Sequence, residues 1–324
     1  MTKPSRVERV TRAAQQLRPP SLASIAAKLD FPYRAPTVPE AVELPEEEPK
    51  TGAHYDSDWA RRFPARYARF FVLEGVLRPV VAVVAQPERR GIDRLDGLEG
   101  PVIFAANHHS HVDAGLLMTS LPEPFRYKVF TAAAADYFFR NRVTGAASAL
   151  ALNAIPIERA KVTRRSANEA AELIDAGWNL AIFPEGGRSP DGWGQSFRGG
   201  AAYLAIRCAV PVVPVHLQGT GRILPKGGKR LQPGRTVVTF GTPIRADEGE
   251  SSSRFAARLE AAVTALADEA TTDWYTARKR AHAAASPSLT GPEAGAWRRT
   301  WALGDRRSRR TRAQPTGPTW PDLR

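Results

Sequence analysis

Between residues 101 and 275, short runs of β-branched and apolar residues alternate with longer alanine-rich segments that have helical spacing. The short runs predict strands at 102–106, 127–131, 154–157, 180–183, 212–216 and 236–240. The longer segments predict helices at 137–149, 164–176, 199–207 and 255–270. Strands that alternate with helices at this spacing predict an α/β layer fold.

One apolar segment ahead of this region, residues 70–85, is interrupted by Glu74, Arg78 and Pro79. It is too short and too polar to predict a membrane span. It predicts instead an amphipathic helix at about 66–86, which could pack on the core or lie at a membrane surface. The sequence leaves both arrangements open.

The ends of the chain lack the alternating pattern. Prolines recur through residues 1–55, and the periodicity fades after about residue 275. We therefore expect a weakly ordered extension over 1–55, a central domain over 56–275 and a basic tail over 276–324. We also expect no secretory signal at the N-terminus, because residues 1–20 contain no apolar core.

Positive charge is concentrated in the tail. The chain carries a formal net charge of +13. Residues 278–324 hold eleven Lys or Arg against three Asp or Glu, so they account for eight of these charges. Such a tail suits an anionic lipid surface, and no nucleic-acid recognition motif accompanies it. The single cysteine, Cys208, lies in an apolar run and is typical of a core residue.

Chemistry gathers at two predicted strand ends, and the first cluster is Asn107-His108-His109-Ser110-His111-Val112-Asp113. Three interpretations compete. Ser110 and Asp113 fit a capping box, with Ser110 as the helix N-cap. His109, His111 and Asp113 have the spacing of a metallohydrolase ligand run. In the third, Asp113 on the first helical turn orients the ring of His108, which then serves as a general base.

The second cluster, Pro184-Glu185-Gly186-Gly187-Arg188-Ser189, follows the strand at 180–183. Two glycines allow backbone N–H groups to approach an anion, and Arg188 can donate two hydrogen bonds to a phosphate. A glycine turn with a surface salt bridge is the competing explanation.

Four blocks, in order, resemble the glycerolipid acyltransferases of the 1-acylglycerol-3-phosphate acyltransferase family, also called PlsC-like. Residues 107–113 match NHxxxxD, and 183–189 match FPEGxRS. Residues 153–159 match GxIxxxR, with Asn153 in place of glycine, and 210–215 match the fourth, proline-containing block. The resemblance covers roughly residues 70–275 and implies a single central mixed sheet flanked by helices.

The resemblance also implies roles for individual residues. His108 would be the general base and Asp113 its orienting partner. Substrate would be held by a larger set, namely Arg159, Glu185, Gly186, Gly187, Arg188 and Pro214. No metal or cofactor is implied beyond the acyl thioester, which is acyl-CoA or acyl-carrier protein.

The implied reaction transfers a fatty acyl group to the free hydroxyl of a lysophospholipid, 1-acylglycerol-3-phosphate first among them, or to another phospholipid or glycolipid acceptor. We expect the protein to lie in the cytoplasm, peripheral on the inner face of the cell membrane. A metallohydrolase that uses His109, His111 and Asp113, and a non-catalytic protein that binds anionic lipid, remain as alternatives from other classes.

Overall fold

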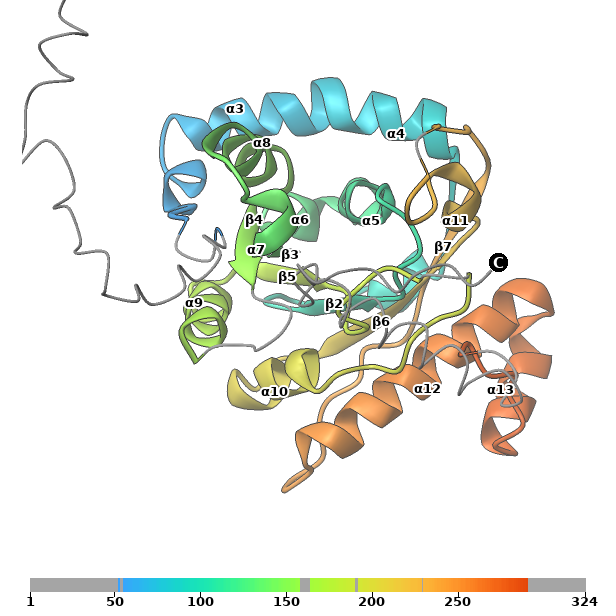
Figure 1. Cartoon of the computed structure of the whole chain (residues 1–324). Coiled ribbons are helices and arrows are strands. Elements are labelled where there is room, and N and C mark those ends of the chain that lie inside the picture. Colours follow the sequence, from blue (N-terminus) through green and yellow to red (C-terminus); the bar gives the residue numbers. More distant parts are fainter. Residues whose placement is uncertain (1–51, 53–54, 158–163, 190–191, 229, 291–324) are drawn as a thin grey trace, which may run out of the picture. The chain divides into compact units, whose positions relative to one another are not determined.

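A computed structural model describes residues 52, 55–157, 164–189, 192–228 and 230–290, all within a unit that spans Lys50–Arg324. Their centre is a mixed sheet with the strand order β1-β7-β6-β2-β5-β3-β4 (Figure 1). All neighbouring strands are parallel except β6 and β7. The strands are β1 (Pro87–Arg90), β2 (Ile103–Ala106), β3 (Val129–Ala134), β4 (Ala154–Ile157), β5 (Asn179–Ile182), β6 (Val212–Gln218) and β7 (Thr236–Phe240).

Helices cover both faces of the sheet. On one face lie α3 (Ala65–Val72), α4 (Arg78–Ala85), α5 (Asp113–Ser120), α6 (Glu123–Arg126) and α8 (Arg142–Leu152). On the other lie α9 (Arg164–Asp175), α10 (Gly200–Arg207) and α12 (Ser252–Thr271), and α13 (Trp274–His282) follows α12. Short helices α7 (Ala135–Phe138) and α11 (Thr220–Ile223) follow β3 and β6, and two single turns are η2 (Asp58–Arg61) and η4 (Ile92–Leu95).

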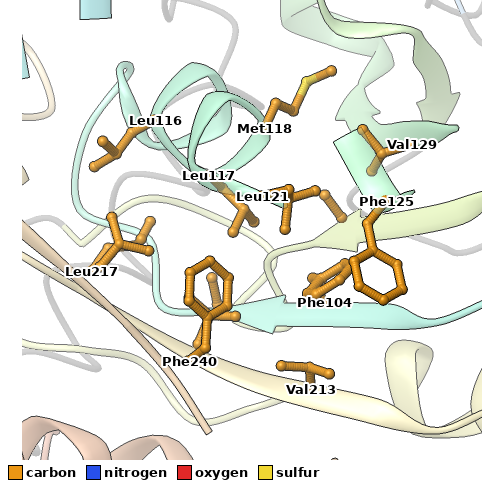
Figure 2. Packing of buried hydrophobic residues seen from close by; sticks show 14 of the residues in the cluster. Phe104, Leu116, Leu117, Met118, Leu121, Phe125, Val129, Val213, Leu217 and Phe240 are labelled. Carbon is orange, nitrogen blue, oxygen red and sulfur yellow. The ribbon is translucent and has the colours of Figure 1, made fainter. Parts of the chain in front are cut away.

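The central strands are buried on both sides, which explains their continuous apolar sequence. Along β2, Phe104 and Ala106 pack toward α5, whereas Ile103 and Ala105 pack toward α10 and α12. Figure 2 shows the first of these layers, where Leu117 of α5 lies over Phe104 and Phe240. The alternation of a period-2 strand therefore fills two cores at once.

The segment predicted as one amphipathic helix is α3 and α4 joined by a π-helical turn, η3 (Leu73–Leu77). Its inward positions, Arg69, Leu73, Leu77, Val81 and Ala85, are spaced four residues apart. In a regular α-helix, two residues that are four apart differ in direction by about 40° around the axis, so a face built from such steps gradually rotates away from the core. The extra residue of the π turn reverses about 100° of this rotation. The turn therefore keeps one face on the core along the whole segment.

The opposite face of this segment carries exposed apolar side chains: Tyr67, Phe71, Val76, Val80 and Val83. The sequence left packing on the core and a place at a membrane surface as alternatives. The inward face packs on the core, and a membrane at the exposed face stays a prediction. Among the described residues, no helix combines the length and the apolar character that a bilayer crossing requires.

Each strand and helix predicted between 102 and 270 is found, with shifts at the ends. The helix expected at 137–149 is divided, because the side chain of Asn141 accepts a hydrogen bond from Thr144 N–H and caps a new helix there. β1 was not predicted. Its sequence, Pro-Glu-Arg-Arg, has no apolar alternation, and the strand lies at the sheet edge beside β7. The expected boundaries at 55 and 275 remain predictions.

Candidate active site

The two chemical clusters meet because their strands are neighbours. β2 and β5 are parallel, with Ile103 opposite Leu180, so their carboxyl ends lie at the same edge of the sheet. At that edge Ser189 N–H donates to the carbonyl oxygen of His108 at 2.8 Å. Residues far apart in the sequence therefore share one site, at the edge where α/β sheets commonly bind ligands.

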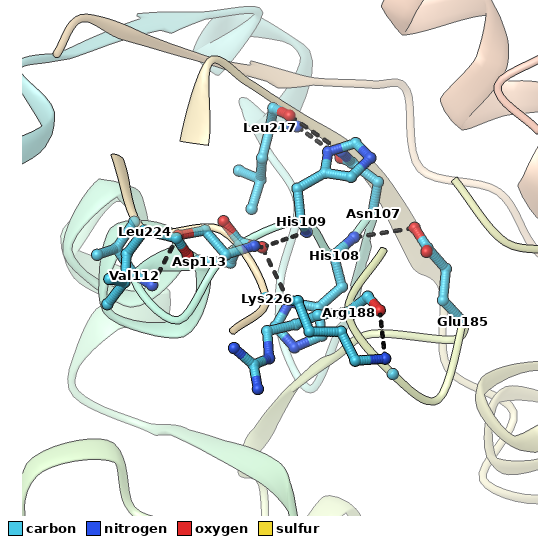
Figure 3. A network of polar contacts seen from close by, with 12 residues as sticks. Asn107, His108, His109, Val112, Asp113, Glu185, Arg188, Leu217, Leu224 and Lys226 are labelled. Carbon is cyan, nitrogen blue, oxygen red and sulfur yellow. Dashed lines mark hydrogen bonds and ion pairs between the residues drawn. The ribbon is translucent and has the colours of Figure 1, made fainter. Parts of the chain in front are cut away.

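His108 and Asp113 are in direct contact (Figure 3): the ring Nδ1 lies 2.9 Å from Asp113 Oδ2. The same carboxylate oxygen accepts hydrogen bonds from the backbone N–H groups of His109 and Ser110, each at 2.7 Å. An ionised carboxylate only accepts, so the contact assigns the ring proton to Nδ1 and leaves Nε2 as the basic nitrogen. The ring also stacks on Phe183, with the two centroids 4.2 Å apart.

The capping-box interpretation is only half right. Helix α5 begins at Asp113 and its N-cap is Val112, not Ser110. Ser110 N–H does donate to Asp113, as that box requires, but the Ser110 hydroxyl donates to the carbonyl oxygen of Leu224 at 2.9 Å. Asp113 can therefore reach back to His108, because the histidine precedes the helix and does not share its face.

Glu185 occupies a different place from the one expected. Only 2% of its surface is exposed, and its two carboxyl oxygens accept hydrogen bonds from His108 N–H at 2.9 Å and Gln195 N–H at 3.0 Å. Burial raises the pKa of Glu185 to about 8, against the opposing effect of these two hydrogen bonds. A buried carboxyl engaged in this way supports the backbone of His108, so the expectation that Glu185 binds substrate directly disagrees with the geometry.

Gly186, Gly187, Arg188 and His108 line one cavity of about 190 Å³. Gly186 has a φ of +70°, and a Cβ there would lie 3.0 Å from the guanidinium carbon of Arg198, so a side chain would be strained. The Arg188 guanidinium lies over the Tyr137 ring at 5.7 Å. The rest of the wall is mainly apolar, with alanines of β3 and α9 prominent in it.

Pro214, one of the expected substrate residues, is not at this cavity. Pro214 is buried in β6, where it faces Gly241 and Leu266, and it is absent from the cavity wall. The strand alternation directs Val213 and Val215 toward α5 and Pro214 the other way. Arg159 lies outside the described residues.

Several residues of the site were not singled out from the sequence. Asn107 Nδ2 donates to Leu217 O at 2.9 Å, and Leu217 N–H donates to Asn107 Oδ1 at 2.7 Å. Phe183 and Asn107 belong to recognised blocks, which could have indicated them. Tyr137 and Arg198 come from segments without a motif, so the surrounding sequence gave no indication that they belong to the site.

The metal interpretation finds no support in the described residues. Among them, no group of three or more His, Cys, Asp or Glu side chains is arranged to hold a metal ion. His109 Nδ1 lies 3.2 Å from Asn107 Nδ2, and His111 Nε2 lies 3.4 Å from the Tyr137 hydroxyl, so the two rings have different neighbours.

Comparison with known proteins agrees with this geometry. The family model described as Acyltransferase matches residues 84–218, which include both clusters. A chloroplastic 1-acyl-sn-glycerol-3-phosphate acyltransferase of Brassica napus is 31% identical over 48% of this chain and 44% of its own length. Its Arabidopsis thaliana counterpart is 30% identical over 49% and 44%. The chain thus spans less than half the length of these curated relatives.

A solved structure has the same fold. It is the 1-acyl-sn-glycerophosphate acyltransferase PlsC of Thermotoga maritima, with a TM-score of 0.51 and 24% identity over 64% of this chain and 84% of that one. The four ordered blocks include the two clusters that lie inside the matched region. Residues 84–218 thus form a region similar to the PlsC-like glycerolipid acyltransferases.

Proposed function

We propose that this protein is an O-acyltransferase that moves a fatty acyl group from acyl-CoA or acyl-carrier protein to the free hydroxyl of a lysophospholipid. The proposed acceptor is 1-acylglycerol-3-phosphate, which would become phosphatidate. The observation that carries the proposal is the His108–Asp113 pair at 2.9 Å, beside a cavity that Gly186, Gly187 and Arg188 also line.

In the proposed reaction Nε2 of His108 takes the proton of the acceptor hydroxyl while Asp113 holds Nδ1–H. The oxygen attacks the thioester carbonyl, a C–O bond forms and the C–S bond breaks. The thiolate then receives the proton from the imidazolium. General-base assistance contributes about 10²–10⁴ in rate, and holding both substrates in place supplies much of the rest. No step requires a metal ion or a redox cofactor.

Binding of the acceptor phosphate is assigned to the turn after β5 and, through the family resemblance, to Arg159. The glycine backbone permits close approach of an anion, and the guanidinium of Arg188 matches the geometry of phosphate oxygens. Glu185 is assigned a positioning role instead. It holds the backbone of His108 through a buried hydrogen bond, away from the substrate phosphate.

The apolar part of the same cavity is assigned to the acyl chain of the thioester. Its wall includes Ala132, Ala167 and Ala170, which leave room beside the sheet, and it reaches the ring of His108. An acyl chain placed there would bring its carbonyl carbon to the catalytic histidine, since the chain and the carbonyl are covalently joined.

We assign a membrane surface as the partner of α3, η3 and α4. The exposed fractions of Tyr67, Phe71 and Val83 are 62%, 68% and 69%, and these side chains lie on the face turned away from the core. Aromatic and apolar side chains in a row along a surface helix bind the boundary between headgroups and acyl chains. A peripheral location at the inner face of the cell membrane is consistent with this assignment, and so is a lipid acceptor.

One assay tests the proposed function. The full chain is incubated with acyl-CoA or acyl-carrier protein and a panel of lysolipids and glycolipids, and products are scored by lipid mass spectrometry and thiol release. We expect phosphatidate from 1-acylglycerol-3-phosphate with the wild type and none with His108→Ala at unchanged circular dichroism. Turnover by His108→Ala at the wild-type rate would refute the mechanism, and product from a different acceptor alone would redefine the substrate.

A further inference from the structure

A second cavity, of about 430 Å³, lies at the same edge of the sheet but beside β7 and β1. Its wall includes two arginines, Arg222 and Arg235, and two glutamines, Gln86 and Gln218. Glu88 also lines it and is ion-paired with Arg90 at 2.7 Å. This wall is polar and cationic, unlike the apolar wall of the catalytic cavity.

The guanidinium groups of Arg222 and Arg235 have no hydrogen bond or ion pair with any residue that the structure describes; the backbone N–H of Arg222 donates to Gly219 O at 3.2 Å. Both are exposed, so their charges are available to a ligand from outside. They belong to the connection between β6 and β7, residues 219–235, which contains five Lys or Arg and no Asp or Glu. The free charges therefore lie in a segment that carries only positive charge.

This connection, which we call the basic segment (219–235), is fixed to the end of α4. Gly234 N–H donates to Val84 O at 2.9 Å, and the Thr236 hydroxyl, one residue beyond the segment, donates to Ala85 O at 2.7 Å. Figure 1 shows α11, the start of the segment, beside the C-terminal end of α4. Val83 of α4 is 69% exposed and Leu231 of the segment 46% exposed, so apolar and cationic surfaces adjoin.

The basic segment also contacts the catalytic loop. The Ser110 hydroxyl donates to Leu224 O at 2.9 Å, and Lys226 Nζ donates to Arg188 O at 3.3 Å. The segment that carries Arg222 and Arg235 therefore also contacts Arg188, which lines the catalytic cavity, although neither of the two arginines lines that cavity.

From these observations we propose that the cavity between Arg222 and Arg235 binds the phosphate headgroup of an anionic phospholipid in the membrane. The inference rests on the proposed function, because it assumes that the protein binds a membrane. It adds that this membrane surface carries anionic lipids. The apolar row on α3 and α4 inserts into any bilayer, whereas guanidinium groups recognise phosphate oxygens and favour an anionic surface. Each arginine near such a surface contributes about fivefold in affinity.

The test compares vesicles of phosphatidylcholine alone with vesicles that also contain phosphatidylglycerol, using the full chain and a sedimentation assay. We expect R222Q/R235Q to bind the anionic vesicles about 25-fold more weakly and the neutral vesicles as the wild type does. R254Q/R278Q is the matched control, because it removes two exposed arginines from α12 and α13. R222K/R235K should retain most of the affinity, which separates loss of charge from loss of structure.

An equal loss in the two glutamine variants would overturn the proposal, because it would indicate diffuse attraction to net charge. Unchanged binding of R222Q/R235Q would overturn it as well. A third arm uses short-chain soluble substrates without vesicles. If R222Q/R235Q raises the KM for acyl-CoA there, the cavity binds the donor's phosphates and the lipid assignment is wrong. The vesicle assay measures binding and requires no catalytic turnover. Failure of the proposed acyltransferase activity would therefore be seen only in the activity assay and would not be mistaken for failure of lipid binding.

Discussion

A carboxyl oxygen of Glu185 accepts a hydrogen bond from the backbone N–H of His108 at 2.9 Å, across 77 residues of sequence. The second oxygen accepts from Gln195 N–H, so one buried side chain holds two loops of the site. Both loops would lose their alignment if this carboxyl were changed, although the residue has almost no surface to offer a substrate.

For Glu185→Gln we expect kcat to fall about 10- to 100-fold with little change in the acceptor KM. The amide would direct an N–H group at one of the two backbone N–H donors, and that donor would be left buried without a partner. Steady-state kinetics over both substrates provides the measurement. A rise in the acceptor KM at constant kcat would instead indicate direct contact with the phosphate.

Asp113→Asn should lower kcat by about 10²–10⁴ while the protein remains folded. The amide carries no negative charge to stabilise the imidazolium, and its NH2 group can face Nδ1 of His108 and move the ring proton to Nε2. The double variant with His108→Ala should be no slower than His108→Ala alone, because the aspartate acts through the ring. Additive losses in this cycle would show that the two residues act independently.

Arg188→Ala should raise the acceptor KM by about 10- to 100-fold, which corresponds to loss of a charge-assisted pair of hydrogen bonds. Arg140→Ala is the matched control, because Arg140 is exposed and does not line the cavity. Titration of 1-acylglycerol-3-phosphate at saturating thioester separates the two. If both variants behave alike, general surface charge accounts for the effect.

Ala167→Leu should shift the proposed acyl transfer toward shorter acyl chains. Ala167 lies on α9 in the wall of the catalytic cavity, and leucine would add three carbons to a space of about 190 Å³. Competition between acyl-CoA donors of different length, scored by lipid mass spectrometry, measures the change. Ala147→Leu on the exposed side of α8 should leave the preference unaltered.

Stability should depend on the protonation of His216, a β6 residue that is only 6% exposed. Burial, together with the neighbouring His109, lowers the pKa of His216 to about 4. Between the ordinary pKa near 6.5 and that value, the unfolded chain binds a proton that the folded chain does not. Stability is therefore full above pH 6.5 and decreases as the pH falls, by about 3 kcal/mol in total at pH 4.

His216→Leu should remove this component of the acid sensitivity. Denaturant unfolding at several pH values between 7 and 4 measures it as a shallower loss of the unfolding free energy. His282→Leu, at an exposed position of α13, is the control and should keep the wild-type slope. Equal slopes for all three proteins would mean that His216 does not titrate in this range.

The strand-end clusters could be predicted from the sequence because parallel strands bring their carboxyl ends to one edge. His108, Asp113 and the glycine turn follow from that rule together with the four blocks. The places of Glu185 and Pro214 could not be predicted in this way. The place of Glu185 depends on a hydrogen bond to a residue 77 positions away, and that of Pro214 on the side of the sheet that its strand position faces. Neither a motif nor the spacing of residues predicts these.

Elements without periodicity were also beyond prediction. β1 has no apolar residue to alternate, and its strand conformation comes from pairing with β7. The π turn between α3 and α4 could not be predicted from the sequence. It shows only as a shift in the spacing of the core-facing residues between the two helices, and which residues face the core is known only from the structure. The cationic cavity is lined by three short stretches, 86–88, 218–222 and 235–237, and none of them has a motif that marks a binding site.

The side chain of Asn107 imitates a peptide group, since it gives and receives one hydrogen bond with the backbone of Leu217. The ladder between β2 and β6 consequently ends on a side chain, and the main chain of Asn107 is free to turn out of the plane. The pairing needs one donor and one acceptor on the side chain, so an aspartate at this position would place a carboxylate oxygen against the carbonyl oxygen of Leu217. The loop that carries His108 thus begins at Asn107, a position that tolerates neither a change of charge nor a shift of one residue.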